Sequence, residues 1–182
     1  MTGPAAQMSD RALKMRQAFD RSFAEPVGAL VPETADFIAI RLGEDPYAVA
    51  MEEIGGLHAE IAVTPCPSSF PEFLGLAAFR GALTPVYDMA ALCGYPTGEA
   101  RWLLLAKGGE IAFAFATFEK HFRIERSAVA ALQQGMGGRH ASGVAARADT
   151  ALPIISLSSV IADLADRIGA RPHSKGASDH VS

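Results

Sequence analysis

The sequence predicts a mainly β protein, an all-β barrel or sandwich that carries a few short helices. Short apolar segments with a two-residue period recur at close intervals, and turns rich in glycine and proline separate them. A hydrophobic content of 49% in 182 residues is ample for one compact domain. Because similar runs of strands lie before and after Pro96, we expect two barrel-like halves.

The first expected element is an amphipathic helix over residues 9–25, with Ser9 as its N-cap and Pro26 just after its end. Its apolar residues recur at spacings of three and four, so they form one stripe that must pack against another surface. The stripe consists of Met8, Ala12, Met15, Phe19 and Phe23. A linker rich in Pro, Gly and Ala follows, and we expect residues 1–35 to be a helix and linker outside the main domain.

Strands and one short helix are expected next. Turn-forming residues at 43–46 predict a hairpin, and three prolines make residues 64–73 a loop. Asp88 is expected to cap the short helix and Gly94 to end it. The expected strands cover residues 36–43, 47–51, 53–61, 73–79 and 82–87, and the helix covers residues 88–94.

The second half of the sequence continues this pattern. Gly108 and Gly109 predict a tight turn between two strands, and the alanine-rich residues 127–135 look helical. The glycine-rich residues 135–143 lack the Gly-Lys-Ser/Thr ending of a phosphate loop and are expected to be a flexible connection. The expected strands cover residues 101–106, 110–118, 144–148 and 152–157.

A closing helix is predicted over residues 158–168. Its spacing places Val160, Ile161, Leu164 and Ile168 on the inward face. The small, polar residues 169–182 are expected to be disordered, which leaves residues 36–168 as the domain.

Charge and composition argue against several classes of protein. A net charge of −4 with scattered lysines and arginines gives no attraction for phosphate backbones, so we expect no nucleic-acid partner. The sequence shows neither a signal peptide nor an apolar run of about 20 residues, so we expect a cytoplasmic protein without direct membrane insertion.

Few residues could carry catalysis. The two cysteines and five histidines form no metal-binding spacing, and no serine lies in a nucleophile motif, so we expect no metal, no cofactor and no enzyme. Cys93 is expected to be a small core residue, and Cys66 a more exposed one. A small β-barrel enzyme that uses Cys66 or His58 is the alternative of another class, and elimination favours a protein that works by contact.

The segment from Phe79 to Asp88 places a cation inside an apolar run. Arg80 and Gly81 separate two strands, and a glycine there permits a turn that projects the guanidinium. Arg80 either belongs to a binding surface or pairs internally with a carboxylate such as Asp88 or Glu53. Pro85 suggests an edge or bulge position in the second of these strands.

Residues 71–96 resemble the CheW-like family, the coupling domain of bacterial chemotaxis signalling. The family pattern is a glycine-containing strand, an Asn-Leu-Arg-Gly turn, an apolar strand that holds Pro-Val, and an Asp that opens a short helix ending in Leu-Gly. The matching residues are Gly75, Arg80, Gly81, Pro85, Val86, Asp88, Leu92 and Gly94. The likeness extends to the first hairpin, the later strands and the closing helix, and so covers residues 36–168.

This resemblance implies two five-stranded SH3-like β-barrels that share a hydrophobic core, without catalytic activity. Family members bridge the cytoplasmic tip of a methyl-accepting chemoreceptor to the histidine kinase CheA. The receptor surface is a groove between the barrels near the position of Arg80, and the kinase contact involves apolar strand-end residues of the first barrel. The protein-binding residues that this implies are Glu53, Ile54, Leu57, Phe79, Arg80 and Gly81, and the structural motif is Gly75, Pro85, Val86 and Asp88.

The chain also departs from the family pattern. Ala78 stands where the family has asparagine. Gly55 and Gly56 stand at positions that are commonly polar or charged, and Ala116 and Ser156 stand at positions that are usually acidic. A divergent coupling protein with an altered or missing partner is therefore expected, and the alternative within binding proteins is a regulatory domain of a different two-component pathway.

The N-terminal helix is extra to the minimal family domain. Its Met15, Phe19 and Phe23 stripe either docks in a groove of the barrel pair or packs elsewhere as a brace or dimer element.

Overall fold

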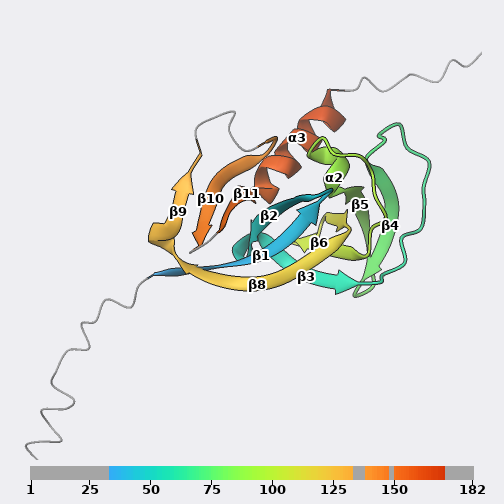
Figure 1. Ribbon diagram of the computed structural model, residues 1–182. Coiled ribbons are helices and arrows are strands. Elements are labelled where there is room, and N and C mark those ends of the chain that lie inside the picture. Colours follow the sequence, from blue (N-terminus) through green and yellow to red (C-terminus); the bar gives the residue numbers. More distant parts are fainter. Residues whose placement is uncertain (1–32, 133–137, 148–149, 171–182) are drawn as a thin grey trace, which may run out of the picture. The chain divides into compact units, whose positions relative to one another are not determined.

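The computed structural model describes residues 33–132, 138–147 and 150–170 (Figure 1). The chain divides into two units, residues 1–33 and 34–182, and both β-sheets of the described residues belong to the second. The predicted N-terminal helix, with its stripe of Met15, Phe19 and Phe23, and residues 171–182 of the predicted tail lie outside the described residues.

Six strands of the described chain make up the first sheet: β1 (Thr34–Leu42), β2 (Asp45–Ala50), β8 (Thr117–Glu125), β9 (Val129–Ala131), β10 (Ala141–Arg147) and β11 (Thr150–Ile155). Their spatial order is β8-β1-β2-β11-β10-β9. Only the neighbours β2 and β11 run parallel within this sheet. We call it the first subdomain.

Five strands make up the second sheet: β3 (Ile54–Ala59), β4 (Phe73–Phe79), β5 (Ala82–Asp88), β6 (Trp102–Ala106) and β7 (Ala112–Phe115). Their spatial order is β3-β6-β7-β5-β4, and β5 runs parallel to β7. We call it the second subdomain. The helical elements are η1 (Met51–Glu53), α2 (Met89–Leu92), η2 (Arg126–Ala128) and α3 (Leu157–Gly169).

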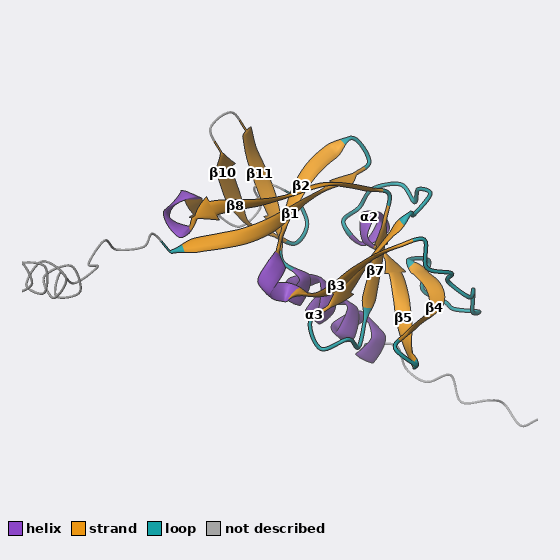
Figure 2. Ribbon diagram, turned by 90° about the horizontal axis from the view of Figure 1, so that it is seen from below, coloured by secondary structure: helices purple, strands orange, loops and turns teal. Residues whose placement is uncertain are grey.

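Two separate segments of the chain make up the first subdomain. The chain forms β1 and β2 there, builds all of the second subdomain with β3 to β7, and returns with β8 to β11 (Figure 2). The predicted division into halves at Pro96 is therefore wrong. The mainly β fold of two subdomains is confirmed, but strands from both ends of the domain complete the first one.

The largest core cluster brings side chains of both sheets and α3 together. Ile40 of β1, Leu104 of β6 and Leu164 of α3 belong to it and are 0%, 0% and 2% exposed. Leu157 and Val160 of α3 join this cluster, whereas Ile168 is 47% exposed, so its predicted inward position is wrong. The last turn of α3 contributes no buried residue.

The predicted strand over residues 110–118 is two strands in different sheets. β7 ends at Phe115 and β8 begins at Thr117, and Ala116 lies between them. The sequence alternates Phe and Ala without interruption, but every residue of β7 is buried, whereas β8 is largely exposed. The break marks the passage of the chain from the second subdomain to the first.

The predicted helix over residues 127–135 is also wrong within the described residues. After the 3₁₀ turn η2, Val129 and Ala131 pair with Ala145 and Gly143 of β10. Alanine has the highest helix propensity, but helix propensity is a small free-energy preference, and backbone pairing with a neighbouring strand outweighs it here. This short strand makes the first sheet six-stranded in place of the expected five.

Of the two positions that the sequence suggested for Pro85, an edge strand is wrong, but the register of β4 and β5 shifts between Phe73 and Gly75, next to the pair of Leu76 and Pro85. β5 lies between β7 and β4 in the second sheet. β7 pairs with β5 only from Val86 onward, so the missing N–H of Pro85 removes no bond of that parallel pairing.

Candidate protein-binding site

Arg80 and Gly81 form the tight turn that joins β4 to β5. The flanking residues Phe79 and Ala82 pair across the hairpin. Both turn residues have positive φ, 49° for Arg80 and 86° for Gly81, as a type I′ turn requires. Glycine adopts this conformation readily, whereas a residue with a side chain does so at about 1–2 kcal/mol. The turn therefore holds the exposed Arg80 at the surface in an unfavourable conformation.

Asp88 does not pair with Arg80. Its Oδ1 accepts a hydrogen bond 3.1 Å long from the Ala91 N–H, so it caps α2 as predicted. Asp88 is only 4% exposed, and burial raises the pKa of its carboxyl group. Gly94, at φ 89°, follows the end of this helix.

Glu53 does not pair with Arg80 either. Its two carboxylate oxygens accept hydrogen bonds, each 3.0 Å long, from the backbone N–H groups of Leu157 and Ser158 at the start of α3. Among the residues that the structure describes, no carboxylate forms an ion pair with Arg80. The expected alternative that Arg80 pairs with Asp88 or Glu53 is therefore wrong. We expected Glu53 to contact a protein partner, but its carboxylate binds the start of α3 within the chain.

Phe79 is the buried residue of β4 that directly precedes the turn. It is 7% exposed, and its ring centroid lies 5.0 Å from that of His58 on β3. The structural motif residues are similarly internal, since Val86 is 0% exposed and a Cβ on Gly75 would overlap the carbonyl oxygen of Thr64.

A groove lies between the two subdomains, with a volume of about 290 Å³. One side comes from β1 and β8 and the other from η1 and β3. We call it the inter-subdomain groove, and its lining residues are Ile38, Met51, Ile54, Gly55, Gly56, Leu57, Phe118 and His121. All but His121 are apolar, and Met51 is 41% exposed.

A second depression adjoins this groove across β3 and has a volume of about 640 Å³. We call it the Arg80 hollow. Its lining residues are Gly55, Gly56, Leu57, His58, Ile61, Ala78, Phe79, Arg80, Ala82, Thr84, Leu105, Gly108 and Gly109. The structure thus brings Ile54, Leu57, Phe79 and Arg80, four of the predicted binding residues, to two adjoining depressions, whereas Gly81 lines neither.

Gly55 and Gly56, which we call the glycine pair, line both depressions. A Cβ on Gly55 would lie 2.7 Å from the backbone oxygen of Ala106, so β6 packs too closely to allow a side chain there. A Cβ on Gly56 would lie 2.7 Å from Nε2 of His58, a side chain that can move. The departure at residue 55 is therefore required by packing, whereas a side chain at residue 56 would require His58 to move.

A family model, described as the CheW-like domain, matches residues 36–165. The chain belongs to the CheW-like domain family. The crystal structure of the scaffolding protein TtCheW from Thermoanaerobacter tengcongensis has a TM-score of 0.62 and 15% identity with this chain. The match covers 68% of this chain and 89% of that one. No curated protein matches the sequence.

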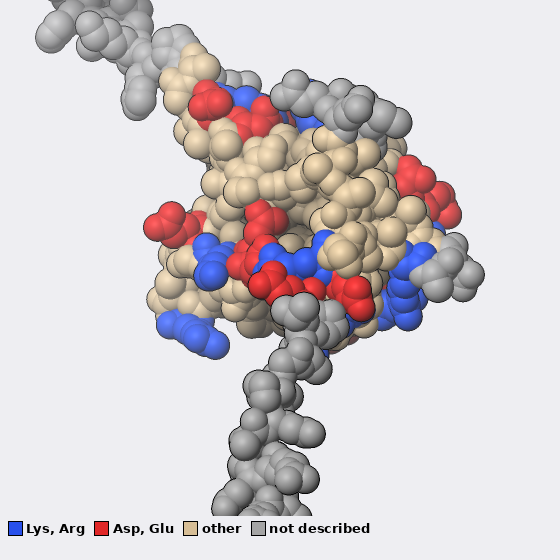
Figure 3. All heavy atoms as spheres, turned by 90° about the vertical axis from the view of Figure 1, so that its left-hand side faces the viewer, with Lys and Arg blue, Asp and Glu red and all other residues tan. Residues whose placement is uncertain are grey.

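The rim of the groove in this CheW-like domain carries an ion-pair cluster. Asp36 of β1 accepts two hydrogen bonds from the Arg123 guanidinium, 2.9 and 3.0 Å long, and lies 2.9 Å from Nε2 of His121. The hydrogen bond from Arg123 is the main cause that lowers the pKa of the Asp36 carboxyl, and burial opposes it. Basic and acidic side chains are likewise interleaved over the face that Figure 3 shows.

The other departures from the family pattern have different surroundings. Ser156 is the N-cap of α3, since its hydroxyl accepts a hydrogen bond from the Ser159 N–H. Ala116 is the exposed junction between β7 and β8, and Ala78 is exposed at the rim of the Arg80 hollow. Ser156 is therefore a structural residue rather than a lost surface contact.

The candidate residues for catalysis have different neighbours. The Cys66 Sγ donates a hydrogen bond to the Thr64 carbonyl, whereas His58 contacts Phe79. Cys93 packs against the main core cluster, and burial raises the pKa of its thiol to about 11. Within the described ranges, no cluster of His, Cys, Asp or Glu could hold a metal ion, and no helix is long and apolar enough to cross a membrane.

Sequence reasoning missed several residues of the groove. Ile38, Met51, Phe118 and His121 all line it. The expected strand over residues 36–43 included Ile38, but no strand was expected over residues 119–125, where His121 lies. The strand pattern could not show that β1 and β8 meet β3, because the pairing of subdomains is a property of the folded chain.

Proposed function

We propose that this CheW-like domain is a non-enzymatic adaptor that couples the cytoplasmic tip of a methyl-accepting chemoreceptor to a CheA-type histidine kinase. It then acts on the cytoplasmic side of the membrane, in receptor arrays, as part of chemotaxis signal transduction. One observation carries the proposal: the apolar inter-subdomain groove adjoins the hollow that contains Arg80, and no carboxylate of the described residues forms an ion pair with Arg80.

The inter-subdomain groove suits the receptor. A chemoreceptor tip is a helical hairpin, and helices bind by placing apolar side chains in such grooves. Half-buried Ile54 and Leu57 and exposed Met51 supply apolar contact area. The nearby guanidinium of Arg80 adds five fixed donors for a carboxylate, as interface arginines often do.

A separate opening among strand ends of the first subdomain suits the kinase. It has a volume of about 480 Å³ and is lined mainly by small and apolar side chains at the ends of β1, β2, β9 and β10. Ala35, Ala50, Val129 and Ala131 are among its lining residues. Two separate surfaces are what an adaptor needs to hold two partners at once.

The test is a pull-down of the full chain with a CheA regulatory domain and, separately, with a receptor tip hairpin. Arg80→Glu should lose at least about tenfold in affinity for the tip, because it replaces an attraction by a repulsion. Its affinity for the kinase domain should stay within about twofold.

Arg101→Glu, a charge reversal at another exposed arginine, is the matched control and should bind both partners like the unaltered chain. Equal binding of the tip by Arg80→Glu and the control contradicts the receptor role of Arg80. Failure of the unaltered chain to bind either partner contradicts the adaptor function and favours a regulatory domain of a different two-component pathway.

A further inference from the structure

The turn before β10, residues 138–140, is attached to the first turn of α3 through His140. The backbone carbonyl of His140 accepts a hydrogen bond 3.0 Å long from the N–H of Ser156, the N-cap of α3. Its imidazole Nδ1 lies 3.1 Å from the hydroxyl oxygen of Ser159. We call these two contacts the His140 tether. Because His140 has φ 66°, in the left-handed region that a side chain makes unfavourable, the tether holds the turn in a strained conformation.

The second ring nitrogen of His140 is buried without a partner. Its Nε2 has no hydrogen-bond partner among the described residues. A neutral imidazole carries one proton, whereas an imidazolium carries a proton on both nitrogens. Protonation would therefore place a donor without an acceptor, together with a full charge, at a half-buried position.

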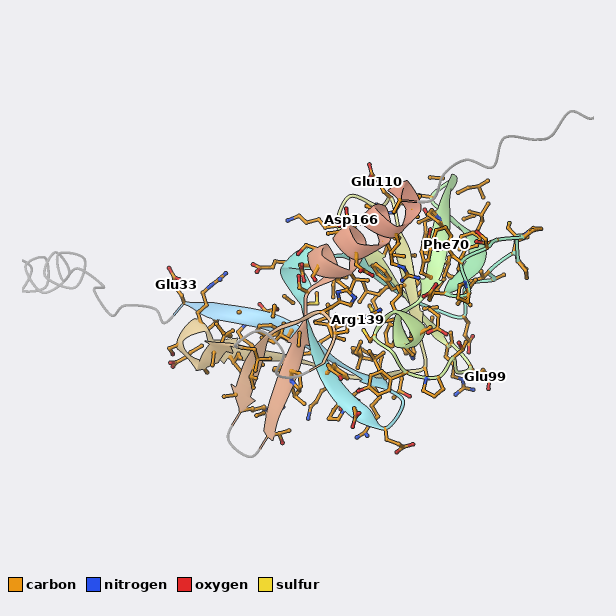
Figure 4. The ribbon with its side chains drawn as sticks, turned by 90° about the horizontal axis from the view of Figure 1, so that it is seen from above. Glu33, Phe70, Glu99, Glu110, Arg139 and Asp166 are labelled. Atoms are coloured by element: carbon orange, nitrogen blue, oxygen red, sulfur yellow. The ribbon has the colours of Figure 1, made fainter. Side chains whose placement is uncertain are left out.

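The carboxylates near His140 are already paired with an arginine. Asp163 of α3 has its Oδ2 3.6 Å from Nη1 of Arg167, one turn further along the helix. Glu72, in the loop before β4, accepts a hydrogen bond 2.6 Å long from Nη2 of the same Arg167. Arg139, labelled in Figure 4, precedes His140 in the turn and adds a second cation.

Two further groups lie near this turn, and neither is a carboxylate. A Cβ on Gly138 would lie 3.3 Å from the hydroxyl oxygen of Tyr47 on β2. Cys93, at the end of α2, lies within reach of the charge of Arg139, but burial raises the pKa of its thiol to about 11. The thiol is therefore uncharged between pH 5 and pH 8 and gives an imidazolium no counter-charge.

Burial lowers the pKa of His140 below the ordinary 6.5. The charge of Asp163 opposes this effect, whereas the charges of Arg139 and Arg167 add to it. A base with a lowered pKa binds its proton less well in the folded chain than in the unfolded chain. Its contribution to stability is therefore full above pH 6.5 and is lost as the pH falls through the folded value.

We propose that the His140 tether is a proton-sensitive switch: the neutral imidazole holds the turn before β10 against α3, and the imidazolium releases it. Release brings the charged ring into water and relieves the left-handed conformation of His140. Because α3 packs against the core cluster that both sheets share, loss of the tether loosens the attachment of the two subdomains to each other. The switch is a property of the domain itself and goes beyond the adaptor function.

The first experiment measures hydrogen exchange of single amides in the full chain at pH 7.5 and pH 5.5. The protection factor of the Ser156 N–H, which donates to His140, should be at least about threefold lower at pH 5.5. The N–H of Leu157 is the internal control, since the Glu53 carboxylate accepts its hydrogen bond, and it should keep its protection.

His140→Asn is the variant for the same measurement. Asparagine tolerates positive φ, and its side-chain amide can still form a hydrogen bond with Ser159, but it does not titrate. The protection factor of the Ser156 N–H should therefore be equal at the two pH values in this variant.

The second experiment leaves His140 unaltered and follows the titration of its ring by NMR in charge variants. Arg139→Gln removes a cation beside the ring and should move the titration midpoint to higher pH, whereas Asp163→Asn removes an attracting carboxylate and should move it to lower pH. Arg101→Gln, a change at another exposed arginine, is the matched control and should leave the midpoint unchanged.

Three results would overturn the switch. The first is a ring of His140 that titrates at or above pH 6.5 in the folded chain, because protonation would then strengthen the tether. The second is equal protection of the Ser156 N–H at both pH values. The third is an equal loss at Leu157, which would assign the effect to general unfolding. Both experiments use the chain alone, so a failure to bind the receptor or the kinase contradicts only the adaptor function.

Discussion

The carboxylate of Glu53 accepts a hydrogen bond 3.0 Å long from the backbone N–H of Leu157. Glu53 ends the 3₁₀ turn by which the chain leaves the first subdomain, and Leu157 begins α3, which packs against the core that both sheets share. Figure 4 shows α3 with Asp166 labelled on it. The side chain of Glu53 thus attaches η1, the segment that connects the two subdomains, to the N-terminus of α3.

Replacing Glu53 should destabilise the domain. Glu53→Ala removes a negative charge and two acceptors from the N-terminus of α3, and should lower the free energy of unfolding by about 1–2 kcal/mol. Glu52→Ala is the matched control, because Glu52 is exposed and lies 3.6 Å from Arg126, so its loss should cost less than about 0.5 kcal/mol. Urea denaturation measures both, and equal stabilities of the two variants would contradict the capping role.

The ion pair between Arg167 and Glu72 should make stability depend on pH. Burial alone would raise the pKa of Glu72, but the Arg167 hydrogen bond, 2.6 Å long, and further attractions lower it below the ordinary 4.5. A lowered folded pKa means that the contribution of this pair is full above pH 4.5 and is lost as pH falls through the folded value.

Arg167→Met should therefore lower the free energy of unfolding by about 1–3 kcal/mol at pH 7, because it leaves a half-buried carboxylate unpaired. The difference from the unaltered chain should shrink as the pH falls through 4.5, the ordinary pKa of this carboxyl, and below it. Urea denaturation between pH 3 and pH 7 checks this; a difference that stays constant with pH would assign the effect to lost packing of the arginine stem.

A side chain at Gly75 should be poorly tolerated. Gly75 has φ 140°, and a Cβ there would overlap the carbonyl oxygen of Thr64, which pairs with Leu76. Gly75→Ala should lower the free energy of unfolding by at least about 2 kcal/mol. Gly98→Ala, in open space, should change it by less than about 0.5 kcal/mol, and thermal unfolding compares the two.

Arg80 should make the turn less stable than a residue suited to positive φ would, while it contributes to the binding of the receptor tip. Arg80→Asn creates the Asn-Gly pair that type I′ turns prefer, and relieves the left-handed conformation of an arginine at φ 49°. The variant should be more stable by about 0.5–1 kcal/mol while binding the receptor tip more weakly. A variant that is neither stabilised nor impaired in binding would contradict both parts of this prediction.

The two cysteines should differ in reactivity. The thiol of Cys93, with its pKa raised to about 11, is almost entirely protonated at pH 8, and it packs against the core. Cys66 lies in the loop before β4, and both cysteines are half-buried. Iodoacetamide should label Cys66 first, and Cys66→Ser should remove the fast phase; labelling of both cysteines at the same rate would contradict the protection of Cys93 by its raised pKa and its packing.

The sequence predicted local structure correctly where the preferences of a few neighbouring residues determine it. The span of β4, the Asp88 cap and the Arg80-Gly81 turn were all predicted correctly, because turn and cap preferences act over a few residues. The resemblance to the CheW-like family rested on the same segment.

The tertiary structure decided what the local pattern leaves open. Residues 110–118 alternate like one strand, yet the chain changes sheet at Ala116, and the alanine-rich residues 129–131 pair as a strand despite a helical composition. The partners of Glu53 and the groove between β3 and β8 depend on contacts across about 60 to 100 residues of sequence. By itself the sequence determined the fold class, the turn that presents Arg80 and the family. The structure alone determined which surfaces meet, because long-range strand pairing depends on the mutual burial of distant segments and leaves no periodic signal in either one.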